Sequence, residues 1–136
     1  MSLQVLDATL GDAYQTTLTV RQHVFTADEP LAVGGTDTAP TPVELLLGSL
    51  AACTAITLRM YAQRKQLPLE GLDVQVQYTA RPVPAVVKVI TPHGPLDDTQ
   101  KARLLEIAEM CPVAKLLKGG VASESRLGPA DAVAQA

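Results

Sequence analysis

An uncharged apolar stretch in the first half of the chain constrains the fold more than any other feature of the sequence. Leu45–Leu58 runs for fourteen residues without a charged side chain, between Glu44 and Arg59. A membrane-spanning helix needs about 20 apolar residues, so a buried helix of a globular domain is favoured. Its apolar positions cover nearly the whole circumference of a helix. We therefore expect it to be buried on all sides, as a central spine or a spine shared with a second subunit.

The flanking residues carry the start and stop signals of one long helix. Thr41 is suited to the N-cap and Pro42 to the first helical position, and Glu44 lies where a capping box needs a carboxylate. Pro68 sets the C-terminal limit, because a proline disrupts a helix and disfavours helical geometry at the residue before it. The sequence therefore predicts a helix from Thr41 to about Gln66.

The rest of the chain alternates between strand, loop and helix patterns without repeats. Leu72–Thr79 has the clearest strand pattern, because apolar and polar residues alternate along it. Since strands and helices follow no regular β-α-β order, the sequence predicts the α+β class, with mixed β-sheets and the long helix at the centre. Before the long helix, the sequence predicts a strand hairpin within Ser2–Val24 that includes Tyr14–Val20, and then a loop over Ala27–Thr41. After it, a strand over Val83–Ile90 is predicted to pair with Leu72–Thr79, and a helix over Thr99–Met110 is capped by Asp97 or Asp98. The last predicted elements are a short helix over Pro112–Lys118, a final strand over Val121–Leu127 and a tail over Gly128–Ala136.

Length and composition limit the class of protein. The 136 residues have the length of one domain, and we treat residues 1–136 as a single domain. The chain carries 11 Lys and Arg against 14 Asp and Glu, and this net charge of −3 argues against binding to nucleic acid. No basic, apolar leader opens the sequence, so we expect a cytoplasmic protein without membrane attachment. Its two cysteines are too few for a disulfide-rich scaffold, and no permanent disulfide is expected in a reducing compartment.

The two cysteines, Cys53 and Cys111, have different local settings. Cys53 falls in the middle of the apolar helix, which by itself is typical of an inert core cysteine. Cys111 precedes Pro112 and so falls at a helix break, just before a new helix whose N-terminus lowers a thiol pKa. On local grounds Cys111 is the more activated thiol. Cys53 would need a cation supplied by another segment to become reactive.

Other site motifs are absent from the sequence or do not fit. The two thiols are 58 residues apart and form no CxxC redox motif. Their spacing to His23 and His93 matches no zinc site, so we expect no metal. His23 is better explained as a strand or loop residue than as an acid or base. The sequence holds no GxSxG elbow, and Gly34-Gly35 has neither dinucleotide-loop nor Walker spacing, so we expect no cofactor.

Three motifs, in order, resemble the OsmC/Ohr family. The run Pro42–Ala62, PVELLLGSLAACTAITLRMYA, resembles the first cysteine helix of that family. Upstream, Ala27–Pro30 and Gly34–Asp37 resemble the loop that leads into this helix. Glu106–Val113, which contains Cys111, resembles the second cysteine site. The resemblance extends along nearly the whole chain and fits the OsmC-like branch best.

This resemblance implies an OsmC-like α+β fold assembled as an intertwined homodimer, with active sites at the subunit interface. It implies a thiol peroxidase that reduces organic hydroperoxides, with hydrogen peroxide as a further candidate, in oxidative-stress defence. By position, Cys53 is the thiol that attacks the peroxide and becomes a sulfenic acid, and Cys111 is the thiol that resolves it as a disulfide. A thiol reductant, often a lipoyl group in this family, then restores both thiols.

The family's peroxidases place an Arg and a Glu near the first cysteine, and this chain offers Arg21 and Glu44 as candidates. The family Glu lies ten residues before the cysteine, where this chain has Val43. Glu44 lies nine residues before Cys53, on the opposite face of a straight helix, and the capping box already explains it. Arg59 is a second candidate cation.

Ala114 takes the place of a His that relatives often carry after the second cysteine. Together with Val43, it favours one alternative to the peroxidase, a dimer that keeps the fold, binds a small molecule or a lipid, and has weak or no turnover. A further alternative is a redox sensor that uses the same disulfide as a switch. The loop Ala27–Thr41 either lines a substrate pocket or packs at an interface, and the sequence does not distinguish these roles.

Overall fold

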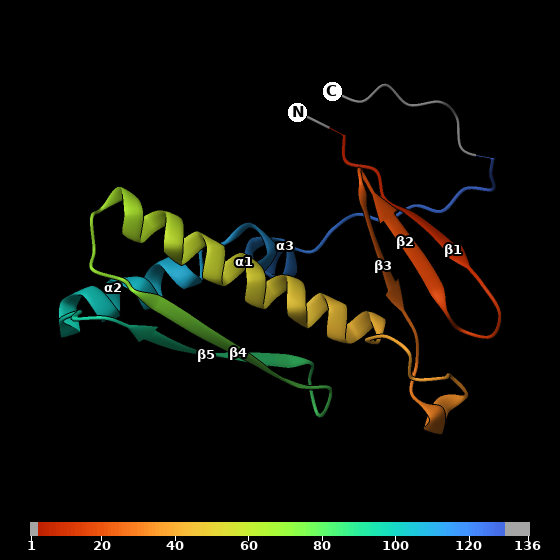
Figure 1. Cartoon of the computed structure of the whole chain (residues 1–136), viewed down its shortest axis with the longest axis horizontal. Coiled ribbons are helices and arrows are strands. Elements are labelled where there is room, and N and C mark those ends of the chain that lie inside the picture. The colour runs from red at the N-terminus through yellow and green to blue at the C-terminus, as the bar shows by residue number, and fades with distance from the viewer. Residues whose placement is uncertain (1–2, 130–136) are drawn as a thin grey trace. The chain divides into compact units, whose positions relative to one another are not determined.

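The computed structural model describes residues 3–129, which form two compact units (Figure 1). The first unit comprises the chain up to Leu45 together with the described residues from Ala122 onward. The second unit, Leu46–Val121, holds both cysteines. Each unit contains antiparallel strands, and the second contains most of the helical residues, which confirms the α+β class.

Three antiparallel strands in the order β1-β2-β3 build the first unit, namely β1 (Asp7–Leu10), β2 (Thr16–Val20) and β3 (His23–Ala27). Threonine and valine dominate β2, as expected for a pleated, half-exposed strand. The predicted hairpin is confirmed, but the third strand was not predicted from the sequence. Arg21 occupies the turn between β2 and β3, with a φ of 53°.

The segment between β3 and the long helix is irregular, as predicted, apart from one 3-10 turn, η1 (Leu31–Val33). Asp28 organises it. Its Oδ2 accepts hydrogen bonds from the hydroxyls of Thr36 and Thr38, both at 2.7 Å, and from Thr38 N at 3.1 Å. Its Oδ1 accepts from Glu29 N at 2.8 Å. These bonds, that from Thr36 first, hold the pKa of Asp28 well below its usual range and fix the conformation of the loop.

The helix α1 (Pro42–Arg64) has close to the predicted bounds. Its capping box is present, because Thr41 N donates to Glu44 Oε1 at 2.9 Å and Glu44 N donates to Thr41 Oγ1 at 3.1 Å. This reciprocal pair satisfies two backbone donors that the first turn leaves without a partner. The start of the helix therefore follows from local sequence.

Within its own unit this helix is not buried on all sides, so the prediction of a central spine is wrong there and a spine shared with a second subunit stays a prediction. Ile56 and Met60 are 55 % and 61 % exposed, because α2, α3 and the strand pair β4–β5 contact only one face of α1. By length and composition alone α1 could cross a membrane, and 17 % of its most apolar segment is buried, although core helices of globular proteins meet the same criterion. The buried residues of α1 are Leu50, Thr54, Leu58, Tyr61 and Ala62.

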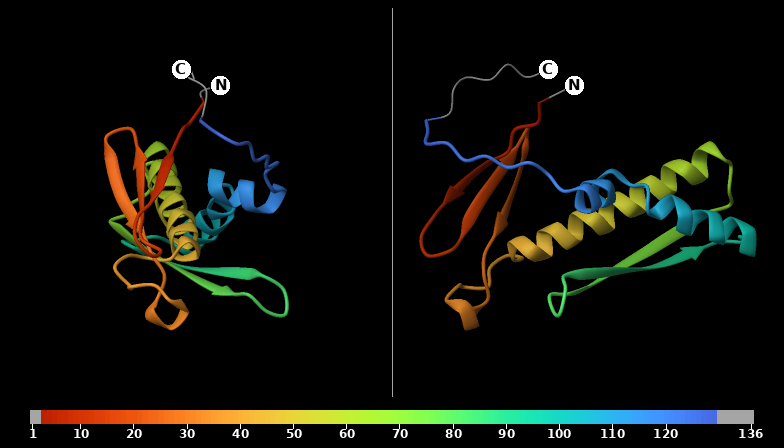
Figure 2. Two further views of the ribbon diagram at one scale, coloured as in Figure 1. Left: turned by 90° about the vertical axis from the view of Figure 1, so that its right-hand side faces the viewer. Right: turned by 180° about the vertical axis from the view of Figure 1, so that it is seen from behind.

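A strand pair lies along α1 in the second unit (Figures 1 and 2). β4 (Gly71–Thr79) and β5 (Ala85–His93) are antiparallel, which confirms the second predicted hairpin. The register pairs Val76 with Lys88, and Ile90 lies on the same face two residues further along β5. Val76 and Ile90 pack against the buried clusters, so the face that carries Lys88 is directed toward the helices.

Two shorter helices complete the second unit. Asp97 caps α2 (Asp98–Ala108) through a capping box with Gln100. Cys111 caps α3 (Pro112–Gly119), which begins with a proline at its first position. Both helices lie where the sequence predicted them.

The predicted final strand over Val121–Leu127 is wrong, because residues 120–129 have no regular secondary structure. A strand needs hydrogen bonds to a neighbouring strand, and the sheets of the described residues contain only β1 to β5. The predicted tail over Gly128–Ala136 lies mostly outside the described residues.

Two clusters of buried side chains form the core of the second unit. The smaller cluster consists of Leu50, Cys111 and Ala114, with Cys53 and the strand residue Val76 among those packed against it. It joins the middle of α1 to the start of α3 and brings the two cysteines into one place. The larger cluster joins α1 and α2 and consists of Leu58, Tyr61, Ala62, Leu69, Leu96, Leu104, Ile107 and Ala108.

Candidate functional site

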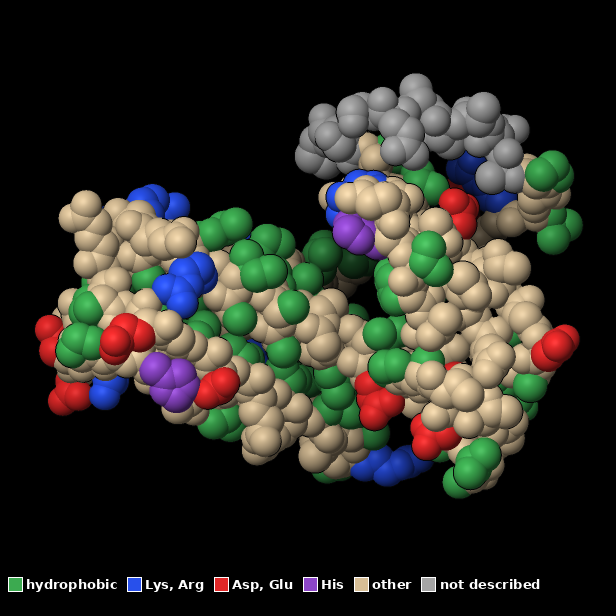
Figure 3. Space-filling model, viewed as in Figure 1, with side chains coloured by type: hydrophobic (Ala, Val, Ile, Leu, Met, Phe, Trp, Pro, Cys, Tyr) green, Lys and Arg blue, Asp and Glu red, His purple; other side chains and the backbone are tan. Residues whose placement is uncertain are grey.

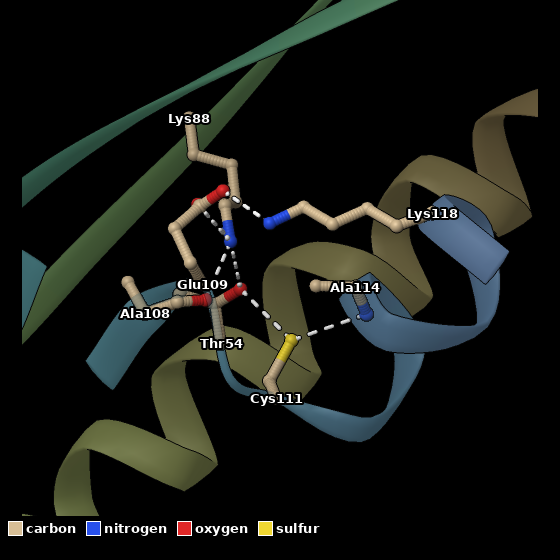
Figure 4. Close-up of polar contacts among 7 residues, drawn as sticks. All are labelled: Thr54, Lys88, Ala108, Glu109, Cys111, Ala114 and Lys118. Carbon is tan, nitrogen blue, oxygen red and sulfur yellow. Dashed lines mark hydrogen bonds and ion pairs between the residues drawn. The ribbon is translucent and has the colours of Figure 1, made fainter. Parts of the chain in front are cut away.

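The side chain of Cys111 is fully buried at the N-cap of α3 (Figure 4). Its Sγ accepts a hydrogen bond from the backbone N–H of Ala114 at 3.4 Å. Pro112 is the first residue of the helix and has a fixed φ, and Cys111 before it is extended, as is typical of an N-cap residue. The backbone donor and the positive end of the helix dipole both favour a thiolate at this position.

Thr54 of α1 provides a second polar contact to the same sulfur. Its hydroxyl oxygen lies 3.7 Å from Cys111 Sγ, and its side chain is completely buried. Because Thr54 follows Cys53 directly, the helix that carries the first thiol also contacts the second.

A lysine from the strand pair reaches this point as well. Lys88 Nζ donates to Thr54 Oγ1 at 3.4 Å and to the carbonyl oxygen of Ala108 at 2.7 Å. It also pairs with Glu109 Oε2 at 3.1 Å, and only 8 % of the lysine side chain is exposed. The other carboxylate oxygen of Glu109 pairs with Lys118 at 2.9 Å. Three acceptors thus satisfy the buried ammonium, which would otherwise be costly to remove from water.

The pKa of Cys111 lies below the ordinary value of a thiol. Burial by itself raises this pKa. Hydrogen bonds from the Ala114 amide and the Thr54 hydroxyl lower it, and the Cys53 thiol and the charge of Lys88 act in the same direction. Together these contacts outweigh burial, so Cys111 ionises more readily than an ordinary thiol although it is buried.

Cys53 is half-buried and packs against the cluster that contains Cys111. Its thiol is close enough to Cys111 to affect the pKa of that residue. The fold therefore places two free thiols together that are far apart in the sequence. Two neighbouring thiols, one of them prone to ionise, are the minimum that a disulfide-forming site requires.

A pocket of about 160 Å³ opens beside this cluster. Leu50 and Ala114, which belong to the buried cluster, form part of its wall. The other lining residues are apolar except for Lys88, Glu109 and Lys118. The pocket is therefore an apolar recess with a small group of charges, a lining suited to an organic molecule.

Comparison with known proteins identifies the family. Residues 35–126, more than half of the chain, match the family model described as OsmC-like protein. The chain belongs to the OsmC-like protein family. No protein with a curated description matches the sequence.

Solved structures agree with this OsmC-like fold. The chain is similar to a protein from Psychrobacter arcticus 273-4 described as an osmotic stress induced and detoxification response protein, with 25 % identity and a TM-score of 0.72 over 85 % of this chain and 88 % of that one. It is similar to an OsmC-like protein from Mycoplasma pneumoniae, with 21 % identity and a TM-score of 0.74 over 86 % and 88 % of the two chains. It is also similar to the organic hydroperoxide resistance protein OhrB of Bacillus subtilis, with 22 % identity and a TM-score of 0.58 over 86 % and 91 %.

The OsmC-like fold brings together two of the four site residues that the sequence predicted, Cys53 and Cys111. The other two, Arg21 and Glu44, belong to the first unit. Arg21 is exposed in its turn and Glu44 is engaged in the capping box, so their catalytic roles stay predictions. Within residues 3–129, no three His, Cys, Asp or Glu side chains gather as a metal site would require.

The cation beside the second thiol is one that sequence reasoning missed. Arg59, a candidate from the sequence, donates from Nη1 to the backbone carbonyl of Leu69 at 2.7 Å and thereby holds the end of the loop after α1. Lys88 instead reaches the thiol cluster. It is the single charged residue of the predicted strand Val83–Ile90, and alternation places it on the same face as Ile90. The sequence signal that could have identified Lys88 is a single lysine on the inward-facing side of an otherwise apolar strand.

Proposed function

We propose that this OsmC-like protein is a thiol-dependent peroxidase that reduces organic hydroperoxides through Cys53 and Cys111. The observation that carries the proposal is the pairing of a half-buried thiol with a buried thiol of lowered pKa. A disulfide can form only between neighbouring sulfurs, one of which must ionise to attack. Organic hydroperoxide resistance proteins from Legionella pneumophila and Bacillus subtilis share the fold, which supports this class of reaction.

The proposed cycle oxidises the two thiols in two steps. The Cys53 thiolate attacks the hydroperoxide oxygen that carries the hydrogen, an S–O bond forms, the O–O bond breaks, and the alkoxide leaves and takes up a proton to become an alcohol. The Cys111 thiolate then attacks the Cys53 sulfur, the S–S bond forms, the S–O bond breaks, and the hydroxide leaves and is protonated to water. A dithiol reductant of the lipoyl type returns the two electrons by thiol–disulfide exchange.

The surroundings of Cys53 favour an organic peroxide over hydrogen peroxide. The thiol packs in a cluster with Leu50, Val76 and Val113, and the neighbouring pocket is largely apolar. Apolar walls bind the hydrocarbon part of a substrate, and hydrogen peroxide has no such part. We therefore expect cumene hydroperoxide to be consumed faster than hydrogen peroxide at equal concentration.

In the proposed reaction Arg21 and Glu44 assist Cys53 as a cation and a carboxylate. The support is the family pattern of an Arg and a Glu near the first cysteine, although Val43 holds the family position of the Glu and Glu44 is the next residue. Glu44→Gln separates this role from capping, because the amide oxygen still accepts from Thr41 N while the charge is lost. Lower peroxide turnover in Glu44→Gln and in Arg21→Gln, with unchanged thermal stability, supports the catalytic roles. Unchanged turnover assigns Glu44 to the helix cap alone.

We also propose that the protein acts as a homodimer in the cytoplasm. Apolar side chains remain at its surface (Figure 3), and on α1 Leu46, Ile56 and Met60 are 47 %, 55 % and 61 % exposed. Together with Cys53 they form one stripe, at intervals of seven, three and four residues. A second copy that covers this stripe would bury the exposed apolar surface and complete the surroundings of the first thiol.

Peroxide consumption by the purified protein tests the peroxidase proposal. With cumene hydroperoxide and dihydrolipoic acid, the wild type should turn over continuously and Cys53→Ser should not exceed the protein-free rate. Cys111→Ser should react once and accumulate a sulfenic acid that dimedone traps. Treatment of the wild type with one equivalent of peroxide should lower the intact mass by two hydrogens.

Two results would point to the alternatives. A wild type that consumes no more peroxide than Cys53→Ser contradicts the peroxidase and leaves the binding of a small molecule in the apolar pocket. A disulfide that forms with peroxide but is not reduced by dithiols in repeated turnover indicates a redox sensor that uses the same two cysteines.

A further inference from the structure

The buried ammonium of Lys88 lies one hydroxyl group away from the sulfur of Cys111 (Figure 4). Nζ is 3.4 Å from Thr54 Oγ1, and that oxygen is 3.7 Å from Cys111 Sγ. An ammonium can only donate, so the Thr54 oxygen accepts from it and keeps its own hydrogen free to donate. Lys88 thereby orients the threonine hydroxyl as a donor to the sulfur, an arrangement that stabilises a thiolate.

Lys88 holds this position whatever the state of the thiol. Its strongest contacts are to groups on α2 and immediately after it, the Ala108 carbonyl at 2.7 Å and the Glu109 carboxylate at 3.1 Å. Carbonyls at a helix C-terminus attract cations, so the end of α2 fixes the ammonium. Glu109 is followed two residues later by Cys111, and the lysine therefore sits against the chain segment that presents the second thiol.

We propose that Lys88, acting through Thr54, is the positioning residue that holds Cys111 as the thiolate which closes the disulfide with Cys53. This inference rests on the two-cysteine cycle proposed above and concerns its second step. The Cys111 proton leaves to solvent before the attack, the S–O bond of the Cys53 sulfenic acid breaks as the S–S bond forms, and the departing hydroxide takes up a proton to give water. The charge of Lys88 is unchanged throughout.

The charges around Cys111 predict the direction in which each substitution shifts the ionisation of its thiol. Lys88 of β5 and Lys118 of α3 are positive, and Glu109, just after α2, is negative and pairs with both. α1 contributes the neutral Thr54 and a thiol, and β4 contributes only the apolar Val76. Removal of the Lys88 charge should therefore disfavour the thiolate, whereas removal of the Glu109 charge should favour it.

A thiolate titration in the Cys53→Ser background tests this sign. Thiolate absorbance near 240 nm is followed against pH, with the Cys53→Ser, Cys111→Ser double variant as the blank, so no reagent has to reach the buried sulfur. Lys88→Met should leave about tenfold less Cys111 thiolate at a given pH below the midpoint, which corresponds to one unit in its pKa. Glu109→Gln should shift the midpoint the opposite way. The matched control Lys118→Met removes a lysine that pairs with the same carboxylate but has no contact with Thr54, and should shift it less than Lys88→Met.

A single-turnover experiment with both cysteines present tests the step itself. After rapid mixing with cumene hydroperoxide, Lys88→Met should slow disulfide formation about tenfold more than it slows sulfenic acid formation, which is timed by dimedone trapping. Thr54→Val keeps the shape of the side chain and removes the hydroxyl, so it should slow the same step. If circular dichroism shows that Lys88→Met does not fold, Thr54→Val alone tests whether the contact through Thr54 speeds disulfide formation.

The two proposals fail in different ways. If the wild type forms no disulfide with peroxide, the peroxidase cycle fails, while the titration of Cys111 still reports on Lys88. If the wild type turns over but Lys88→Met and Thr54→Val titrate and close the disulfide like the wild type, the role of Lys88 is overturned and the peroxidase stands. A shift for Lys118→Met as large as that for Lys88→Met would also overturn it, because general charge rather than contact through Thr54 would then explain the effect.

Discussion

The two compact units bury their residues in different ways. The second unit closes around apolar side chains, and Leu58 and Leu104 are 0 % and 1 % exposed. In the first unit, the described residues that are buried are Ala27, Asp28 and Gly35 alone. The second unit thus has an apolar core, whereas the first is organised by hydrogen bonds around one carboxylate.

The first unit nevertheless has apolar side chains, and they are exposed. Leu10, Val24 and Phe25 on its strands are 68 %, 65 % and 39 % exposed. A small sheet gains its stability from burying an apolar face, so this sheet needs a covering surface that its own unit does not provide. The second unit therefore has its own buried core and the first does not, and the exposed apolar side chains of the first unit support the proposed homodimer together with the exposed stripe on α1.

The largest expected effect is on the core of the second unit. Leu58→Ala removes a fully buried side chain from the larger cluster and should lower the free energy of unfolding by about 2–5 kcal/mol, measured by urea denaturation. Leu10→Ala in the first unit should cost no more than about 0.5 kcal/mol at protein concentrations where the chain is monomeric. Equal losses of unfolding free energy in the two variants would contradict the conclusion that only the second unit has an apolar core.

The next largest loss in the free energy of unfolding is expected in the loop between β3 and α1. A Cβ at Gly35 would lie 1.9 Å from the Glu29 carbonyl oxygen, so Gly35→Ala forces the backbone apart and should cost about 1–3 kcal/mol. Gly11→Ala is the matched control in the same unit, because its Cβ would lie 3.4 Å from the nearest atom, the Gln15 carbonyl oxygen. Denaturation curves should place Gly11→Ala near the wild type. A harmless Gly35→Ala would show that the loop around Asp28 is not packed as described.

The exposed stripe on α1 gives the third prediction. Ile56→Glu places a charge among apolar side chains that a second copy should cover, and it should raise the dissociation constant of the dimer at least tenfold, or about 1.4 kcal/mol. Val83→Glu, at a similarly exposed apolar position between β4 and β5, is the control and should leave the dimer intact. Sedimentation velocity measures both. Dimers that survive Ile56→Glu but not Val83→Glu would move the interface to the strand pair.

Acid should distinguish the carboxylate networks of Asp28, which is buried, and of Glu109, which is about half exposed. Hydrogen bonds, first from Thr36, lower the pKa of Asp28, and the lysines, first Lys118, lower that of Glu109. Each carboxylate therefore contributes stability that is present above its ordinary pKa, 3.8 for Asp28 and 4.5 for Glu109, and is lost as the pH falls toward the folded-state value.

Salt separates these two contributions. Charge pairs are screened at about 1 M salt, whereas hydrogen bonds to neutral hydroxyls are affected much less. Asp28→Asn should flatten the dependence of stability on pH in low and in high salt, and Glu109→Gln should do so mainly in low salt. Thermal unfolding between pH 3 and pH 6 measures this, and a Glu109→Gln effect that persists in high salt would contradict the ion-pair account.

Local sequence signals predicted most of the fold. The capping boxes at Thr41 and Asp97, the proline after Cys111 and the alternation in Leu72–Thr79 each fix one element through contacts within a few residues. The errors concern pairing and burial. The strand β3 was not predicted, and the strand predicted over Val121–Leu127 is irregular, because pairing depends on a distant strand that local alternation does not reveal.

The sequence predicted the two thiols of the site but not the charged residues beside them. Cys53 and Cys111 stand in contexts that a family resemblance recognises, and the fold brings them together. Lys88 was missed because its partners come from two distant segments, the middle of α1 and the end of α2, and only the register of β5 turns it toward them. Long-range side-chain contacts of this kind follow from packing of the helices on the strand pair, which no local pattern specifies.

The smallest expected effect tests how much of α1 a second copy covers. Gly48 lies on an exposed turn of the helix, and a Cβ added there would meet no described atom within 4 Å apart from its chain neighbours and the helix's own backbone. Gly48→Ala should therefore raise the free energy of unfolding by about 1 kcal/mol through helix propensity alone. At about 100° per residue, Gly48 lies about 160° around the helix from Leu46 but only about 80° from Ile56, so it flanks the stripe on one side. A gain in stability with an unchanged dimer shows that the partner does not extend from the stripe to Gly48. A weakened dimer would mean that the partner approaches Gly48 as well and covers more of the helix than the stripe.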